Sequence, residues 1–174
     1  MVTSEDPDAL FERGYEAFRA SRFEEAVDLF ERARGLSPRR SRTLVYFARA
    51  HYGLGRYAEA ERVLDALVAL RPEDPWSWFR RGHARHAQGH YREALEDIDE
   101  AVRLEMGDNV FDQGLDELFL LQASCWEHLG ELERAISSFE MYGFAYGHRY
   151  VVEREVARLR AMIDSRKGSR KKGQ

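Results

Sequence analysis

Residues 75–108 read PWSWFRRGHARHAQGHYREALEDIDEAVRLEMGD, and this stretch decides the fold. Pro75 suits a first helical turn, because the N–H that it lacks would have no partner there. Gly89 stands where a helix commonly ends in a left-handed conformation. Apolar residues then recur at helical spacing over Tyr91–Leu104. The stretch therefore predicts a helix, a tight turn and a second helix.

The same pattern recurs with a period of 34 residues. Its four copies are Gly14-(x6)-Ser21-x-Phe23-x-x-Ala26, Ala48-(x6)-Gly55-x-Tyr57-x-x-Ala60, Gly82-(x6)-Gly89-x-Tyr91-x-x-Ala94 and Ala123-(x6)-Gly130-x-Leu132-x-x-Ala135. The fourth copy follows the third by 41 residues, which is one period plus seven. A fixed period of this length is typical of stacked helical hairpins. Such proteins bind partners on extended surfaces.

Small residues hold two positions of each copy, one in each helix. They are Gly14, Ala48, Gly82 and Ala123 in the first helices, and Ala26, Ala60, Ala94 and Ala135 in the second helices. Helix axes approach to roughly 8 Å only where the contacting side chains are small. Larger residues fill the remaining space: Leu10, Leu44, Trp78 and Phe119 early in the copies, and Phe30, Leu64, Ile98 and Phe139 late. Pro38 and Pro72, one period apart, are expected to end the second helices.

This set of residues resembles the tetratricopeptide repeat family over residues 7–149. The resemblance implies an all-α, right-handed helical-hairpin solenoid of about four repeats with a C-terminal capping helix. The expected parts are an N-terminal extension 1–6, repeats 7–40, 41–74, 75–108 and 116–149, an insert 109–115, a capping helix 150–165 and a disordered basic tail 166–174.

The seven-residue insert has two interpretations. Seven residues make about two turns of an α-helix, so the insert could lengthen the next helix to about 110–129 without rotating its buried face. Gly114 disfavours this by roughly 1 kcal/mol of helix propensity, and a loop is the alternative. We favour the longer helix.

Apolar residues form one stripe along the last predicted helix: Val152, Val156, Leu159 and Ile163. A solenoid needs a final element with one polar face, because its last repeat would otherwise expose core residues. We therefore predict a cap. The same stripe would suit a coiled-coil partner, so a homodimer through this helix or the convex face is the alternative.

The tail carries five cations and no acid: Arg166, Lys167, Arg170, Lys171 and Lys172. We expect a solubilising, disordered end. An electrostatic tether to nucleic acid or to an acidic protein surface is the alternative.

Composition excludes several classes of protein. The net charge is −4, and no apolar run is long enough to cross a membrane. The first ten residues, MVTSEDPDAL, lack the apolar core of a secretory signal, so we expect a cytoplasmic location. The single cysteine, Cys125, is expected to be a buried small hydrophobe, with a reactive thiol as the alternative.

The family resemblance also implies a binding site. In such stacks the first helices line a concave surface on which peptides bind. The corresponding places hold mostly aromatic and arginine residues: Phe11, Tyr15, Phe18, Arg42, Tyr46, Arg49, Tyr52, Trp76, Phe79, Arg80, His83 and His86. These types are enriched at binding hot spots. The expected partner is a protein segment with apolar and acidic residues, although several of the aromatics could instead only pack against neighbouring helices.

The resemblance makes one subtype of ligand unlikely. Chaperone-binding members grip a C-terminal carboxylate with a clamp of Lys, Asn and Arg. The corresponding places here hold Phe11, Tyr15, Tyr46, Trp76 and Arg80, and only Arg80 fits.

Catalytic and metal-binding motifs are missing from the sequence. His83, His86 and His90 are close together, but no other ligand completes a zinc spacing, and His90 falls beyond the helix-ending glycine. No phosphate-binding glycine loop or nucleophile motif is present. We therefore predict no cofactor, no metal and no enzymatic activity, but a protein–protein adaptor or assembly factor.

Overall fold

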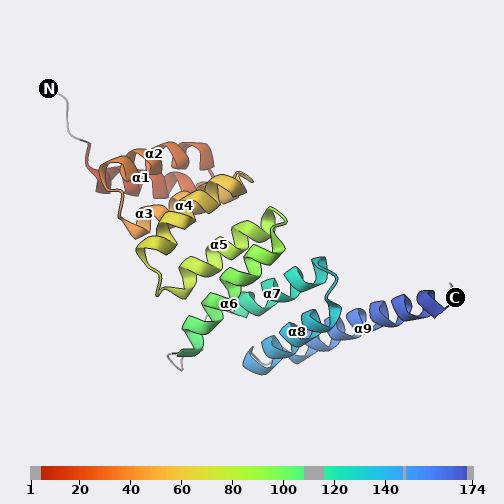
Figure 1. The fold of residues 1–174 in the computed structure, drawn as a ribbon. Helices are drawn as coiled ribbons and strands as arrows, with labels where there is room; N and C mark the ends of the chain where they lie inside the picture. The colour runs from red at the N-terminus through yellow and green to blue at the C-terminus, as the bar shows by residue number, and fades with distance from the viewer. Residues whose placement is uncertain (1–4, 108–115, 147, 172–174) are drawn as a thin grey trace. The chain divides into compact units, whose positions relative to one another are not determined.

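The computed structural model describes residues 5–107, 116–146 and 148–171, in which it has nine helices and no strand (Figure 1). The helices are α1 Pro7–Arg19, α2 Phe23–Leu36, α3 Ser41–Gly53, α4 Tyr57–Leu70, α5 Pro75–Ala87, α6 Tyr91–Gly107, α7 Asp116–His128, α8 Leu132–Tyr146 and α9 Arg149–Lys171. The predicted all-α class is confirmed. The choice between helix and loop for the insert lies outside the described residues.

Tight turns join the two helices of each hairpin through a left-handed residue. Gly55, Gly89 and Gly130 have φ of 70°, 81° and 80°. Glycine adopts this region without the steric cost that a Cβ brings. The first hairpin uses Ser21 at the same place, with φ of 59°. The sequence pattern aligned Ser21 with the glycines but did not predict that it shares their conformation.

The chain divides into two compact units, one up to His90 and one from Tyr91. In the first unit each helix from α1 to α5 packs against its neighbour in the chain, and α6 to α9 do the same in the second unit. Contacts between sequence neighbours are the rule in repeat proteins, where each element buries the apolar face of the preceding one.

Small residues allow the closest helix contacts in the first unit. A Cβ on Gly14 would lie 2.8 Å from Cε1 of Phe30, so only glycine lets α1 approach α2 this closely. Ala26 and Ala60 have no exposed surface, and Ala48 is 2% exposed. Phe30, which has no exposed surface either, fills the space that Gly14 leaves.

The last helix, α9, covers the end of the second unit. Val156 and Leu159 are buried against the core that α8 contributes, and Val152 and Ile163 pack on its edge. This apolar stripe is therefore packed within the chain, as a cap would be, and the capping role stays a prediction. A dimer through the same stripe would have to displace that packing.

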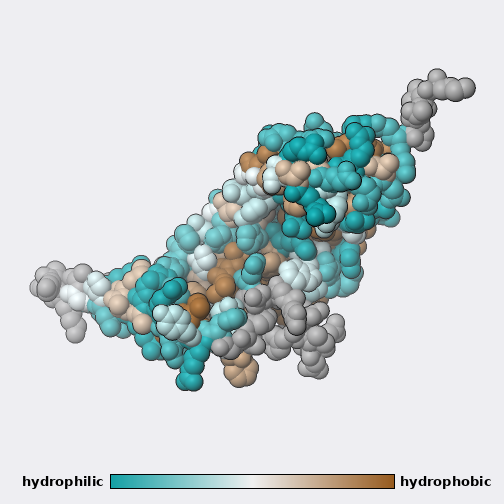
Figure 2. All heavy atoms as spheres, turned by 180° about the vertical axis from the view of Figure 1, so that it is seen from behind, coloured by the Kyte–Doolittle hydropathy of each residue, from teal (hydrophilic) through white to brown (hydrophobic). Residues whose placement is uncertain are grey.

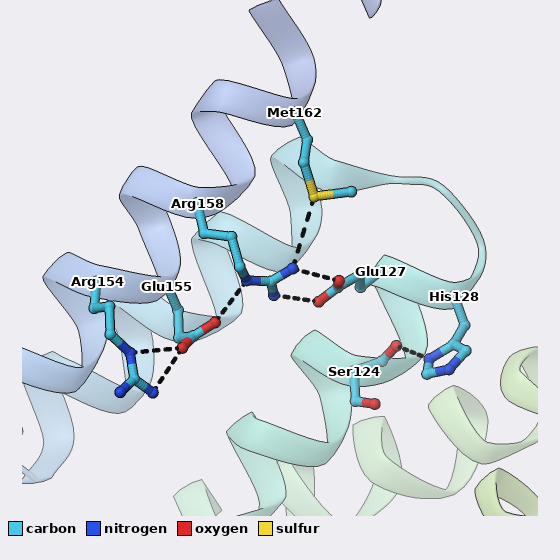
Figure 3. Close-up of polar contacts among 7 residues, drawn as sticks. All are labelled: Ser124, Glu127, His128, Arg154, Glu155, Arg158 and Met162. Atoms are coloured by element: carbon cyan, nitrogen blue, oxygen red, sulfur yellow. Dashed lines mark hydrogen bonds and ion pairs between the residues drawn. The ribbon is translucent and has the colours of Figure 1, made fainter. Parts of the chain in front are cut away.

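An arginine on α9 ties the cap to α7 (Figure 3). Both Nη1 and Nη2 of Arg158 donate to Glu127, each at 2.7 Å, and its Nε donates to Glu155 at 2.8 Å. Arg154 bonds the other oxygen of Glu155. Hydrogen bonds from Arg158 lower the pKa of both carboxyl groups.

The basic tail differs from the prediction. Helix α9 continues to Lys171, so the expected end at residue 165 and the expected disorder are corrected for residues 166–171. Straight-chain Lys and Arg are good helix formers, and their charges favour a helix C-terminus. Arg166 also donates to the carbonyl of Gly130 at 3.2 Å, which holds this turn of α9 against the α7–α8 turn.

Burial suppresses the reactivity of the single cysteine. Cys125 has no exposed surface, and burial raises the pKa of its thiol to about 12. Because the thiolate is the nucleophile, this agrees with the predicted structural role.

The outer surface is largely hydrophilic. Figure 2 shows polar side chains over most of one face, with hydrophobic side chains gathered in smaller patches between them. Among the described residues, no helix is both long and apolar enough to cross a membrane.

Candidate functional site

The predicted groove residues all lie in the first unit, on α1, α3 and α5. These helices begin at Pro7, Ser41 and Pro75, so equivalent positions recur every 34 residues. The repeat therefore presents the same face of three successive first helices. We call the twelve predicted residues on this face the aromatic–arginine cluster.

Tyr46 is the centre of the first half of the cluster. Its ring centroid lies 5.8 Å from that of Phe11, 4.9 Å from that of Tyr15 and 5.6 Å from that of Phe18, all in edge-to-face geometry. Aromatic pairs prefer this arrangement because the positive ring edge meets the negative ring face. The structure thus brings three predicted residues of α1 together with one of α3.

The second half of the cluster joins α3 to α5. The ring centroids of Tyr52 and His83 are 5.2 Å apart, and His83 lies 6.0 Å from Phe79. Trp76 meets the same Phe79 ring edge-to-face at 5.7 Å. His86, also predicted, is half-buried on α5.

Two members of the cluster are buried too deeply to contact a ligand. Phe11 has no exposed surface, and Phe79 is 5% exposed. Phe11 packs against Phe30 of α2, with ring centroids 5.6 Å apart. The prediction that these two residues face a ligand is therefore corrected, because helical spacing turns them into the core that supports the site. For these two residues the alternative applies: they pack against neighbouring helices.

Each arginine of the cluster lies over an aromatic ring. The guanidinium carbon of Arg42 is 4.1 Å from the Phe11 centroid, that of Arg49 is 5.3 Å from Tyr46, and that of Arg80 is 5.1 Å from Trp76. Cation–π contacts of this kind contribute about 0.5–1 kcal/mol at exposed sites and hold the planar group in place. The arginines are therefore ordered before any ligand arrives.

The three arginines differ in their ion pairs. Arg42 donates to Glu12 at 3.2 Å. Arg80 donates to the carbonyl of Trp76 in its own helix, also at 3.2 Å. Burial lowers the pKa of Arg80; the charge of Asp74 raises it, and the neighbouring charge of Arg49 lowers it again. Arg49 and Arg80 are thus close enough to repel each other.

No metal centre emerges around the histidines. His83 is engaged with aromatic rings, and His90 follows the left-handed Gly89. Within residues 5–107, 116–146 and 148–171, no group of three or more His, Cys, Asp or Glu side chains could hold a metal ion. The absence of a cofactor and of a metal stays a prediction.

Sequence reasoning missed the link between Arg158 and Glu127, which are 31 residues apart. No periodic signal connects them, because α9 stands outside the repeat.

Exposed apolar residues at the junction of α8 and α9 were also missed: Met141, Phe144, Tyr150 and Val151. Phe144 is 86% exposed and Tyr150 is 78% exposed.

Hairpin geometry and packing between neighbouring helices define the class: a helical-hairpin repeat protein. Two models of one family, each described as tetratricopeptide repeat, match residues 17–78 and 75–108. The chain belongs to the tetratricopeptide repeat family.

Similar proteins include one human chain and two solved structures. Human RNA polymerase II-associated protein 3 is 29% identical over 104 residues, which are 60% of this chain and 16% of that protein. The first TPR of Spaghetti (RPAP3) bound to HSP90 peptide SRMEEVD is 26% identical, with a TM-score of 0.63, covering 74% of this chain and 97% of that one. MamA is 14% identical with a TM-score of 0.80 over 95% of this chain and 86% of that one, which shows the fold alone.

Proposed function

We propose that the chain is an adaptor or assembly factor that binds a peptide segment of a partner protein on the aromatic–arginine cluster. The observation that carries this proposal is the stacking of Arg49 and Arg80 on aromatic rings of α3 and α5, where neither arginine forms an ion pair with another described residue. Arginine and aromatic side chains are the types that dominate binding hot spots.

Physical chemistry supports a peptide as the ligand. Tyr15, Phe18, Tyr46, Tyr52 and Trp76 are half-buried, so each offers one accessible side to apolar side chains. Aromatic rings supply a large contact area at low cost in conformational entropy. The guanidinium groups offer planar forks that match carboxylates. Together these groups suit a segment with apolar and acidic residues.

The similar structure of the RPAP3 repeat domain supports the ligand class, because its bound HSP90 peptide, SRMEEVD, is acidic. This similarity does not identify the partner of this chain. Four of the five clamp positions here hold Phe11, Tyr15, Tyr46 and Trp76, and Phe11 is buried. The partner of this chain therefore remains to be identified by experiment.

A pull-down with a surface variant tests the proposal. We expect a partner to be captured from lysate of the source cell by the wild type and lost from an Arg49→Ala, Trp76→Ala, Arg80→Ala triple variant. A matched Arg62→Ala, Arg92→Ala variant, changed at exposed residues outside the cluster, should retain it. Circular dichroism checks that each variant is folded. A partner that all three proteins retain equally would contradict the proposal.

The other predicted functions receive less support. The stripe needed for a dimer is packed within the chain, and no observation on the described residues favours nucleic-acid binding by the tail. A dimer through the convex face, a cytoplasmic location and the lack of enzymatic activity stay predictions.

A further inference from the structure

Arg80 differs from every other half-buried arginine in the described residues. Four others are half-buried: Arg34, Arg40, Arg81 and Arg85. Each of them forms an ion pair, with Glu31, Asp8, Asp65 and Glu61 respectively. Arg80 forms none; its hydrogen bond goes to a main-chain carbonyl of its own helix. A charge removed from water without a counter-charge costs free energy, and proteins usually avoid it by pairing.

A second unpaired cation increases this cost. Arg49, on α3 of the preceding hairpin, also lacks an ion pair among the described residues, and its charge lowers the pKa of Arg80. Asp74 offsets part of this repulsion without pairing with Arg80. The Tyr52–His83 ring contact at 5.2 Å brings α3 and α5 together on this face, and each guanidinium group lies over a ring of its own helix. Two guanidinium groups held on one face without an ion pair among the described residues form a preorganised site for one anionic group.

Aromatic rings border this pair of arginines. The guanidinium carbon of Arg49 lies 5.1 Å from the ring centroid of Phe18 on α1 and 5.3 Å from that of Tyr46 on α3. On α5, the guanidinium of Arg80 lies over Trp76. The remaining arginine of the cluster, Arg42, already pairs with Glu12. The surface therefore offers one anion site between apolar contacts, and no second free arginine for another anion.

We infer that Arg49 and Arg80 bind the side-chain carboxylate of a single internal Glu or Asp in the partner segment, with apolar residues on both sides of it, and that the segment needs no free C-terminus. This inference rests on the proposed function, since it specifies which peptide the cluster binds. A C-terminal Glu or Asp would bring two carboxylates, one from its side chain and one from the chain end. In the cluster, Arg49 and Arg80 are the two arginines without an ion pair among the described residues, and together they bind one carboxylate.

Binding would relieve the unfavourable electrostatics of the free protein. A carboxylate between the two guanidinium groups screens their repulsion and pairs with Arg80 where water is partly excluded. Charge-assisted hydrogen bonds of this kind are about twice as strong as neutral ones. Replacing the Glu of a bound peptide by Gln should therefore weaken binding about tenfold or more.

Synthetic peptides and the full chain test this inference. One panel carries a central Glu between Leu, Met, Phe or Val residues, with an acetylated N-terminus and an amidated C-terminus; a second panel carries Gln in its place. SRMEEVD is added both as the free acid and as the amide. Affinities are measured by fluorescence anisotropy for the wild type, Arg80→Gln and Arg49→Gln. Arg22→Gln is the matched control, because Arg22 is exposed, lies outside the cluster and loses the same charge from a residue that pairs with Glu25.

The expected result is that blocked Glu peptides bind the wild type and Gln peptides bind about tenfold more weakly or worse. Arg80→Gln and Arg49→Gln, folded by circular dichroism, should reduce the preference for Glu, and Arg22→Gln should retain it. If SRMEEVD binds only as the free acid, or if Gln and Glu peptides bind equally, the inference is overturned while the proposed function stands. If no Glu peptide binds the wild type, the inference is overturned, and the pull-down with the triple variant decides the proposed function separately.

Discussion

Replacing Gly14 by alanine tests the packing of the first hairpin most sharply. The new Cβ would lie 2.8 Å from Cε1, 2.9 Å from Cδ1 and 3.2 Å from Cζ of Phe30. The ring of Phe30 has no exposed surface and is enclosed by Phe11 and Tyr46, whose centroids are 5.6 and 6.4 Å away. It therefore has little room to move.

Two opposing terms set the size of the effect. Alanine gains about 1 kcal/mol of helix propensity over glycine. Overpacking a well-filled core costs about 1–3 kcal/mol. We expect Gly14→Ala to lie between neutral and about 2 kcal/mol destabilising. Gly35, on α2, has no neighbouring atom within 4 Å of the equivalent Cβ, so Gly35→Ala should be stabilising by up to about 1 kcal/mol.

Urea unfolding followed by tryptophan fluorescence measures this difference. Of the three tryptophans, Trp76 and Trp78 lie in the first unit and Trp126 in the second. A Trp126→Phe background therefore reports on the unit that contains the substitution. Equal stabilisation by Gly14→Ala and Gly35→Ala would refute the close approach of α1 to α2.

Three further predictions concern a turn, a buried histidine and the cap. Ser21→Gly should stabilise the protein by about 1 kcal/mol in urea unfolding, because glycine adopts the positive φ of this turn without strain; a loss of stability would contradict this. Burial lowers the pKa of His51 in the folded protein below 6.5. As the pH falls, the unfolded chain therefore binds a proton at this residue before the folded protein does, and the free energy of unfolding should decrease as the pH drops below about 6.5. His51→Phe should reduce that dependence in unfolding curves at about pH 7.5 and about pH 5.5, and an unchanged slope would speak against it. Arg158→Gln should destabilise the second unit by only about 1 kcal/mol, since Arg158 is 43% exposed, and should speed hydrogen exchange along α9; unchanged exchange would show that the link to Glu127 does not hold the cap.

The period of the sequence predicted much of the fold for a simple physical reason. A helical hairpin that must bury both faces against its neighbours needs small residues, a left-handed turn and large apolar residues at fixed places. Gly89 and Gly130 therefore take the conformation that the pattern required. Ser21 shows the limit of this reasoning, because a residue's type does not reveal that its turn is strained.

The candidate site was predicted as a set of helix positions but not residue by residue. Counting along a helix does not give its rotation, and Phe11 and Phe79 turned out to be buried. The ion pairs of the arginines were equally hidden, because Arg42 pairs with Glu12 of another helix, while Arg80 forms no ion pair with any residue that the structure describes. The length of α9 was underestimated, since a run of Lys and Arg resembles a solvated tail until Arg166 finds the carbonyl of Gly130.

Site-specific photocrosslinking in the source cell tests the central claim most directly. A photoreactive phenylalanine derivative is placed at Trp76 in the cluster or, as the control, at Tyr150, an exposed aromatic residue of the second unit. The account predicts a crosslinked partner protein from position 76 that Arg80→Gln weakens, and no such product from position 150. A partner that crosslinks from position 150 and not from position 76 would contradict the claim that this chain binds its partner through the aromatic–arginine cluster.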